Sequence, residues 1–478
     1  MKLKRLIKDL EIKNFKGSKE IEIEALTSNS KLASPGCMFI AKRGAKFDGN
    51  DYIHDAILAG ATCILTDIFN PFFENIAQII VGDVPKAESK IAKEFFQDPA
   101  RELFMVGITG TKGKTTTSYL TKHIFNGFES MGLIGTIERI VGENSYTSDL
   151  TTADCITTLK LLREMIICHD TAAVLEISSH GLAQNRADPL SFDVAVFTNL
   201  SPEHLDYHSS MEDYFLQKKK LFSRLKPSGV AIINVDDPYS KRLDLNHPIT
   251  IGIDSDAEYR AGNIRITPEG TYFELHHQEQ IWPIFVPLIG KFNVYNVLCA
   301  IAIARVRKFP MEMIIQRLKT FPPISGRMER IELGDEKTAY IDFCHTEDSL
   351  RQALLSLRDV TSGKIVLIFG CGGNRDALKR PQMAKVAEEL ADLTIITNDN
   401  PRNEDPVEIA RAIIQGFRGN NYELIYDRKE AIARGISLLN QGDLILIAGK
   451  GHEKKQIFQG KSVDFDDIAI AKELANCV

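Results

Sequence analysis

The chain has 478 residues, enough for about two to four domains, and 44% of them are hydrophobic while 26% are charged. A net charge of −6 gives no overall basis for nucleic-acid binding, and no apolar run approaches the roughly 18 residues that a membrane span needs. The charged N-terminus does not resemble a secretory signal, and the eight cysteines are scattered without a CxxC pair. We therefore expect a cytoplasmic globular protein with reduced thiols and no nucleic-acid or membrane partner.

The first hundred residues predict a small domain with short strands and helices. Strands are expected at residues 21–23, 37–41 and 62–66, and a helix at 55–58 that ends before Gly60. The next helix is broken at Asp98-Pro99, so a domain boundary is expected near residue 103.

A glycine-rich turn follows the apolar residues 103–108, which predict a buried strand, and precedes a helix expected at 119–125. A strand, a glycine turn and a helix N-terminus form an anion site, in which backbone N–H groups and a lysine meet phosphate oxygens. The common P-loop pattern has a further glycine where Ile108 stands, so the turn is a shorter variant. We predict nucleotide binding, with a plain strand–helix connection as the alternative. The turn reads Gly110-Thr111-Lys112-Gly113-Lys114-Thr115-Thr116, and Thr115 or Thr116 can offer a hydroxyl to Mg²⁺.

Apolar strands alternate with helical stretches in the rest of the chain. This alternation predicts an α/β fold with three domains: residues 1–103, a central 104–325 domain with a P-loop-type, mostly parallel sheet, and a smaller Rossmann-like, doubly wound 326–478 domain. Ligands of such sheets bind at the carboxyl ends of the strands. The strands are expected at 172–177, 194–198, 230–234, 339–342, 365–369, 393–397 and 443–448, and Glu176, Thr198, Asp342, Gly370, Asn398 and Gly449 lie at or near their ends.

Further motifs follow the glycine turn in order along the chain. They are LEISSHGL at 175–182, FTNL at 197–200, EHLDYH at 203–208, PLIGKFN at 287–293, GRME at 326–329, GCGG at 370–373, DNPR at 399–402 and GKGHE at 449–453. Together with the turn, this set resembles the Mur ligases over nearly the whole chain.

The resemblance implies an ATP-dependent enzyme that forms an amide bond. A substrate carboxylate attacks the γ-phosphate of ATP, which yields an acyl phosphate and ADP, and an amine then displaces phosphate. The motifs match most closely the member that adds the third residue of the peptidoglycan stem peptide, whose substrate carboxylate is the D-Glu of UDP-MurNAc-L-Ala-D-Glu. We expect a monomer with small-molecule substrates only.

The resemblance also assigns the catalytic and ATP-binding residues. Lys114 is expected along the β- and γ-phosphates, and Thr115, Glu176 and His204 match metal ligands that suit Mg²⁺. The alternative for Glu176 is a capping or salt-bridging carboxylate. His204 and His208 could share a helix face, but a zinc site is not favoured because no HExxH pattern is present. The implied nucleotide contacts are Gly110, Thr111, Lys112, Gly113, Lys114, Thr115, Thr116, Asn296, Arg327, Asp342 and His345.

Lys218 matches the lysine that is N-carbamylated in this family. Carbamylation needs a neutral amine, which burial or neighbouring cations favour. Only one lysine of the 218–220 run can face a pocket, and the register from Tyr214 selects Lys218; the alternative is a solvated charge run.

Two stretches depart from the family pattern. Residues 341–347 read IDFCHTE where the family usually has DYAHTP, so Asp342 and His345 are retained while the proline is lost. Arg327 follows a glycine at the domain linker and could sense closure onto ATP, or instead form an interdomain salt bridge. In the first domain, the family's Asp-Ser-Arg appears as Asn29-Ser30-Lys31. The positions that match the UDP-MurNAc-dipeptide site are Ser30, Thr151, Thr152, Ser179, Gln184 and Arg186.

The DNPR motif is the family's signature for meso-diaminopimelate. A guanidinium can clamp the second carboxylate of this amino acid through two parallel hydrogen bonds, and lysine would leave buried cations unpaired at a cost of about 1–3 kcal/mol. Arg402 is expected to be the clamp, with Arg375 as a second cation beside Asn374, where the family usually has aspartate. The implied diaminopimelate contacts are Arg375, Asp399, Asn400, Pro401, Arg402, Gly449 and Glu453.

Other functions are less consistent with these motifs. A lysine-adding relative usually lacks the arginine after the proline, and a D-Ala-D-Ala-adding ligase or a folylpolyglutamate synthase should not carry DNPR. A catalytically silent nucleotide-binding protein would not need Lys114, Glu176, His204, Lys218 and Asp342 together.

Overall fold

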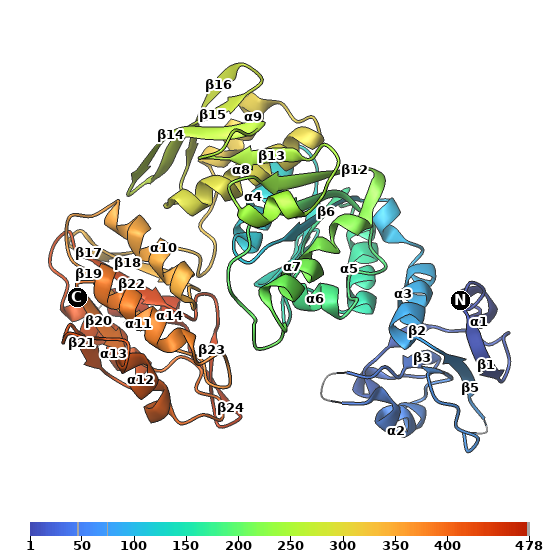
Figure 1. Cartoon of the computed structure of the whole chain (residues 1–478). Coiled ribbons are helices and arrows are strands. Elements are labelled where there is room, and N and C mark those ends of the chain that lie inside the picture. Colours follow the sequence, from blue (N-terminus) through green and yellow to red (C-terminus); the bar gives the residue numbers. More distant parts are fainter. Residues whose placement is uncertain (45–46, 74, 476–478) are drawn as a thin grey trace. The chain divides into compact units, whose positions relative to one another are not determined.

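A computed structural model describes residues 1–44, 47–73 and 75–475 of the chain (Figure 1). The chain divides into two compact units, and each is described by itself. One comprises Met1–Gly107, Glu129–Ala195 and Gln217–Gly229; the other comprises Ile108–Phe128, Val196–Leu216 and Val230–Val478. The predicted α/β fold with mostly parallel sheets is confirmed, whereas the division into domains 1–103, 104–325 and 326–478 stays a prediction.

The N-terminal sheet has the strand order β1-β5-β4-β3-β2, and only its edge strand β1 runs antiparallel to its neighbour. The strand predicted at 21–23 is wrong: Glu22 forms an isolated bridge with Lys2, and this stretch bonds to the N-terminal turn instead of the sheet. The elements are α1 (Leu3–Leu6), β1 (Ile12–Lys16), β2 (Ala25–Thr27), η1 (Ser30–Leu32), β3 (Cys37–Ile40), α2 (Ile53–Leu58), β4 (Cys63–Thr66), β5 (Ala77–Val81) and α3 (Val84–Phe95).

The central sheet has the order β16-β15-β14-β13-β12-β11-β6-β10-β7-β8-β9. Its ends are antiparallel, with the ribbon β14–β16 at one edge and β7–β9 at the other, and the sequence did not predict this ribbon. The strands are β6 (Phe104–Thr109), β7 (Met131–Ile134), β8 (Glu138–Val141), β9 (Asn144–Thr147), β10 (Ala172–Glu176), β11 (Phe192–Phe197), β12 (Leu225–Asn234), β13 (Ile249–Gly252), β14 (Tyr259–Thr267), β15 (Gly270–His277) and β16 (Gln280–Val286). The helices are α4 (Lys114–Phe125), α5 (Cys155–Ile167), α6 (Ser179–Ala183), α7 (Met211–Lys219), α8 (Lys291–Val306) and α9 (Met311–Lys319).

The last sheet has the order β17-β18-β22-β19-β20-β21, parallel except for β17. Its strands are β17 (Glu329–Gly334), β18 (Lys337–Asp342), β19 (Ile365–Phe369), β20 (Leu393–Ile396), β21 (Tyr422–Leu424) and β22 (Leu444–Ala448). Around it lie α10 (Glu347–Arg358), α11 (Lys379–Leu390), α12 (Pro406–Ile414), α13 (Arg428–Ser437), α14 (Asp467–Ala475) and the hairpin β23 (Lys455–Phe458) and β24 (Lys461–Asp464).

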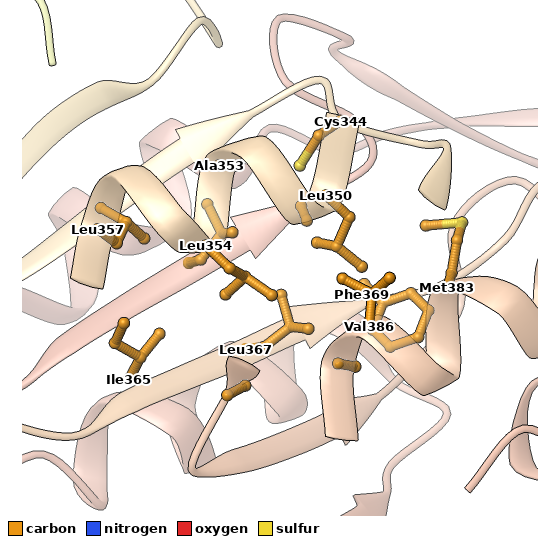
Figure 2. Close-up of a cluster of buried hydrophobic side chains, with 14 of the residues drawn as sticks. Cys344, Leu350, Ala353, Leu354, Leu357, Ile365, Leu367, Phe369, Met383 and Val386 are labelled. Atoms are coloured by element: carbon orange, nitrogen blue, oxygen red, sulfur yellow. The ribbon is translucent and has the colours of Figure 1, made fainter. Parts of the chain in front are cut away.

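Both faces of this last sheet are buried, as its continuous apolar strands predict. Along β19, Leu367 and Phe369 face one core with α10 and α11 (Figure 2). Val366 and Ile368 face a second core with α13 and α14. Alternate side chains of a strand point to opposite faces, so a strand that is apolar throughout can fill two cores. Because the strands of this sheet other than β17 are parallel, their carboxyl ends lie at the same edge.

Candidate active site

The glycine turn joins β6 to α4, and the helix begins at Lys114, five residues before the predicted start. Gly113 has φ +85°, and a Cβ there would lie 2.3 Å from the Asn296 side-chain oxygen, so the position requires glycine. Lys114 lies at the helix N-terminus, where the helix dipole favours an anion, and its Nζ donates to the carbonyls of Gly110 at 2.9 Å and Thr111 at 3.0 Å.

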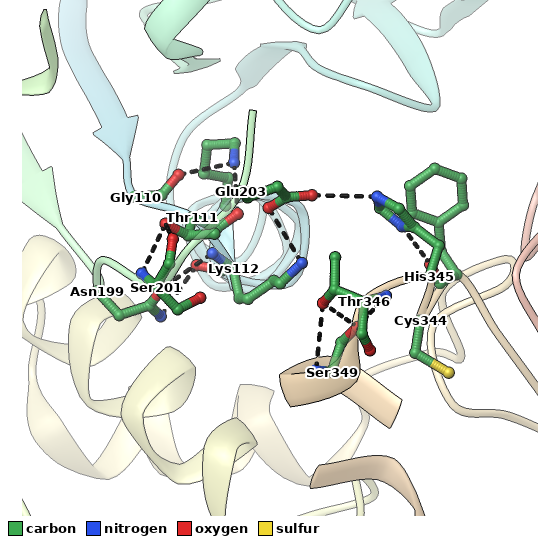
Figure 3. Close-up of polar contacts among 12 residues, drawn as sticks. Gly110, Thr111, Lys112, Asn199, Ser201, Glu203, Cys344, His345, Thr346 and Ser349 are labelled. Carbon is green, nitrogen blue, oxygen red and sulfur yellow. Dashed lines mark hydrogen bonds and ion pairs between the residues drawn. The ribbon is translucent and has the colours of Figure 1, made fainter. Parts of the chain in front are cut away.

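The segment after β11 forms hydrogen bonds with the glycine turn (Figure 3). The Lys112 amide donates to Asn199 Oδ1 at 2.9 Å, and the Thr111 amide donates to the Asn199 carbonyl at 2.9 Å. Thr198 Oγ1 donates to the Lys112 carbonyl at 2.6 Å. These bonds restrict the conformation of the turn, which lowers the entropic cost of binding phosphate.

Glu203 links the turn to the loop after β18. Its carboxylate accepts from Lys112 Nζ at 3.1 Å and lies 3.0 Å from His345 Nε2, and only 10% of the side chain is exposed (Figure 3). Burial raises the pKa of Glu203, but Lys112 and His345 outweigh burial and hold the pKa well below its usual range. Sequence reasoning did not assign Glu203 a role; its place beside His204 in the EHLDYH motif was the available signal.

The structure brings Arg327 close to both Thr115 and Asp342, three of the residues assigned to the nucleotide by resemblance. The Arg327 guanidinium donates to Thr115 Oγ1 at 3.4 Å and lies 4.8 Å from the centre of the Phe343 ring. Asp342 accepts from the amides of Met328 at 2.8 Å and Cys344 at 2.8 Å. Burial outweighs the attraction of Arg327 and raises the pKa of Asp342.

The loop before α10 lacks the family's proline, and a side-chain cap begins the helix instead. Thr346 caps α10 by accepting from the Ser349 amide at 3.4 Å, and Glu347 takes the first helical position. Proline is favoured at that position for its fixed φ, and glutamate is favoured because it complements the helix dipole. The loop therefore keeps His345 directly before a well-capped helix.

In the other unit, Glu176 and the threonines of residues 151–152 form one polar cluster. Glu176, buried at the end of β10, accepts from the Thr136 amide at 3.0 Å and hydroxyl at 2.8 Å. Thr136 Oγ1 also lies 3.1 Å from Thr151 Oγ1, and Thr152 Oγ1 donates to the Glu176 carbonyl at 2.9 Å. Arg186 donates to the Thr152 carbonyl at 2.8 Å.

The remaining substrate positions lie on short elements of the same unit. Arg186 also donates to the Gln184 side chain, and Ser179 is buried as the first residue of α6. Ser30 opens η1, whose N-cap Asn29 accepts from the Lys31 amide at 3.0 Å. Asparagine thus performs the capping role at this point, as aspartate also would.

Lys218 is buried as its register predicts, whereas His204 is not on a helix. Within the lysine run, Lys218 is the buried side chain, 1% exposed, whereas Lys220 is exposed. His204, however, does not share a helix face with His208, because both lie in the turn before α7 and His204 has φ +59°. The shared helix face that their spacing allowed is therefore not formed, because α7 begins only at Met211.

The arginines of the last sheet lie on neighbouring loops. Arg402 has φ +55°, and its Nη1 donates to the Gly373 carbonyl at 2.8 Å. A Cβ at Gly372 would lie 2.8 Å from Arg402 Nη1 and 3.8 Å from Arg375 Cγ, so both side chains pass this glycine. Burial lowers the pKa of Arg402, and the nearby Arg375 lowers it further.

The other predicted diaminopimelate contacts surround the same edge of the sheet. A Cβ at Gly449 would lie 2.7 Å from Asp399 Oδ2, so glycine lets these two loops touch. Asn400 Nδ2 donates to Glu453 Oε2 at 2.7 Å, and the buried Lys450 donates to the same oxygen at 3.2 Å. Lys450 was not predicted from the sequence, although it stands within the GKGHE motif.

Two features of the described residues bear on other classes of site. Within the described residues, no helix combines the length and apolar character needed to cross a bilayer. In the same part of the chain, no three His, Cys, Asp or Glu side chains gather closely enough to hold a metal ion by themselves. A cation at the glycine turn would therefore need further oxygen ligands from a bound phosphate or from water.

Comparison with known proteins accounts for this arrangement. Three family models match: the Mur ligase family catalytic domain at residues 22–95, the Mur ligase middle domain at 108–304, and the Mur ligase glutamate ligase domain at 326–451. The UDP-N-acetylmuramoyl-L-alanyl-D-glutamate–2,6-diaminopimelate ligase of Chlamydia caviae is 40% identical over 99% of both chains, and the ligase of the same name from Halalkalibacterium halodurans is 38% identical over 95% of this chain and 94% of its own. A solved structure of a ligase with this name covers 100% of this chain and 99% of its own, with 29% identity and a TM-score of 0.70.

The fold and the glycine-turn site thus define an ATP-dependent ligase that forms amide bonds. The chain belongs to the Mur ligase family.

Proposed function

We propose that this ligase joins meso-diaminopimelate to the D-Glu carboxyl group of UDP-MurNAc-L-Ala-D-Glu in the cytoplasm. The observation that carries the proposal is the pair of arginine side chains, Arg402 and Arg375, that lie against Gly372 beyond the end of β19, with the Arg375 charge near enough to lower the pKa of Arg402. Two cations at one point suit an amino acid with a second carboxylate. The names of the two curated relatives support the same substrate.

The glycine turn supplies the chemistry of activation in this proposal. The D-Glu carboxylate attacks the γ-phosphate of ATP, and the resulting acyl phosphate is attacked by the amine with loss of phosphate. Lys114, at the N-terminus of α4, neutralises charge on the β- and γ-phosphates, and Arg327 adds a second cation near Thr115. Asn296 lies against the turn at Gly113 and accepts from Thr117 at 3.2 Å, which positions it beside the nucleotide.

Mg²⁺ and a modified lysine complete the proposed machinery. Mg²⁺ supplies charge neutralisation at the phosphates when bound, and Thr115, Glu176 and His204 are its proposed protein ligands. A hydroxyl and a carboxylate fit a cation that prefers oxygen and completes its shell with phosphate and water. Burial of Lys218 supports its N-carbamylation, because burial disfavours the charged ammonium that cannot react.

One assay tests the proposed function. Phosphate release is measured with ATP, Mg²⁺ and UDP-MurNAc-L-Ala-D-Glu while candidate amino acids are supplied one at a time. We expect release with meso-diaminopimelate and little with L-lysine or D-Ala-D-Ala. Equal or faster turnover with lysine would reject the substrate assignment, and ATP turnover that needs no amine would reject the ligase reaction.

The clamp itself is tested by Arg402→Ala. Loss of the guanidinium should raise KM for meso-diaminopimelate by about 10- to 200-fold while KM for ATP stays nearly constant. Arg411→Ala is the matched control, because Arg411 lies on α12 of the same sheet domain in an exposed pair with Glu408. Equal increases in the two KM values of Arg402→Ala would contradict the clamp.

A further inference from the structure

The loop that carries Arg375 and the loop that carries Arg402 are joined by an ion pair whose arginine is buried and whose glutamate is partly exposed. Arg380, in the first turn of α11, has a side chain only 3% exposed and binds Glu404 with both terminal nitrogens, at 2.6 and 2.8 Å. Glu404 follows Arg402 by two residues, and Arg380 follows Arg375 by five. The pair therefore ties the start of a helix to the loop that bears the proposed clamp.

Both oxygens of Glu404 take part in this junction. Oε2, besides its bond to Arg380, accepts from the Asn374 amide at 3.0 Å, and the Asn374 side chain accepts from the Asn403 amide at 3.1 Å. Arg380 and Asn374 hold the pKa of Glu404 below its usual range. Glu404, the acidic residue nearest to Arg402 in this part of the sequence, therefore pairs with Arg380 and does not neutralise the charge of Arg402.

The backbone of the loop that carries Arg375 also contacts the backbone of the loop that carries Arg402. The Gly373 amide donates to the Asn400 carbonyl at 2.9 Å, and a Cβ at Gly373 would lie 1.9 Å from the Pro401 carbonyl oxygen. Asn374 has φ +53° and Arg402 has φ +55°, so each loop holds one residue in the left-handed region. Such conformations cost free energy, and they persist only where neighbouring contacts impose them.

We propose that Arg380 and Glu404 are positioning residues for amino-acid selection: their ion pair, with Asn374, sets the spacing of the Arg375 and Arg402 guanidinium groups to fit a distal carboxylate. The inference rests on the proposed function in that it assigns the arginines to the incoming amino acid. Two nearby cations repel each other, and a bidentate clamp works only when its donors keep their geometry. An ion pair outside the pocket supplies that constraint without touching the ligand.

The test compares Glu404→Gln with Glu389→Gln. Glu404→Gln keeps the size of the side chain but removes its charge, and we expect KM for meso-diaminopimelate to rise about tenfold or more while KM for ATP and for the dipeptide substrate changes less than about twofold. Glu389→Gln is matched, because Glu389 binds Arg351 with two bonds of 3.0 and 2.9 Å on the exposed side of the same domain. It should leave all three KM values unchanged.

A second pair of variants covers the case in which Glu404→Gln fails to fold. Asn374→Ala removes an exposed side chain and the acceptor of the Asn403 amide, whereas Asn374→Asp keeps that acceptor. We expect Asn374→Ala to raise KM for the amino acid several-fold and Asn374→Asp to retain the wild-type value. Unchanged amino-acid KM in both Glu404→Gln and Asn374→Ala would overturn the proposal, and so would equal increases in the KM values of all three substrates.

Failure of the proposed function gives a different result. If the wild-type enzyme accepts another amino acid instead of meso-diaminopimelate, the substrate assignment fails, and the same variants are then measured with the accepted amino acid. A selective rise in its KM would still support positioning by Arg380 and Glu404, and an unchanged KM would overturn it.

Discussion

Lys114→Ala is expected to abolish measurable ligase turnover, with kcat reduced by about 10²- to 10³-fold or more. In phosphoryl transfer the protein contributes mainly position and charge, and Lys114 is the cation at the N-terminus of α4. Its Nζ bonds two carbonyls of the turn, at Gly110 and Thr111, and their loss should cost only about 1–2 kcal/mol of stability. Phosphate release and thermal unfolding are measured on the same preparation.

Lys122→Ala is the control for this variant. Lys122 lies in the last turn of the same helix, far from the glycine turn, so its loss should leave turnover close to wild type. Wild-type activity in a Lys114→Ala protein of normal thermal stability would contradict the assignment of the phosphate site.

Asp467→Ala should be the most destabilising single substitution that we predict, at about 3–5 kcal/mol. Arg428 and Asp467 form a pair with both side chains fully buried, joined by two bonds of 2.8 Å. Arg428 also donates to the carbonyls of Ala448 at 2.9 Å and Asn398 at 3.4 Å, where the GKGHE and DNPR loops begin. Loss of Asp467 leaves a buried cation without its counter-ion at the base of both loops.

Urea denaturation followed by circular dichroism measures this effect. Glu473→Ala is the matched control, because Glu473 and Lys429 form an exposed pair at 3.0 Å between the same two helices, α13 and α14. Exposed pairs contribute about 0–1 kcal/mol, so the control should unfold close to wild type. Similar losses in both variants would show that burial of the Arg428 pair does not matter.

Several elements could be predicted because their local sequence is unambiguous. Strands such as β19 and β22 are apolar throughout, and such runs indicate strands covered on both faces. The glycine turn before α4 was recognisable because glycines and lysine occur together after an apolar strand. The helix was nevertheless predicted to begin too late, because its threonine-rich first turn has low helix propensity and is held by tertiary contacts such as the Thr117 bond to Asn296.

Residues that act through contacts distant in sequence were missed. Glu203 meets His345, and Arg380 meets Glu404, across separations that no local pattern encodes. Lys450 was passed over because a lysine is normally exposed, and only the folded loops show that it is buried among Asn400, Glu453 and the Lys455 carbonyl. A charged side chain in the sequence does not indicate whether it will be solvated or paired.

Residue types at fixed local spacing were therefore enough to identify the α/β class and the family to which the chain belongs, and the same spacing predicts a nucleotide site at the glycine turn. The folded structure was needed to show which other charged residues are buried, such as Lys450 and Arg428, and which loops contact each other. These features depend on packing between segments far apart in the chain, where burial and partner choice set the energy of every charge.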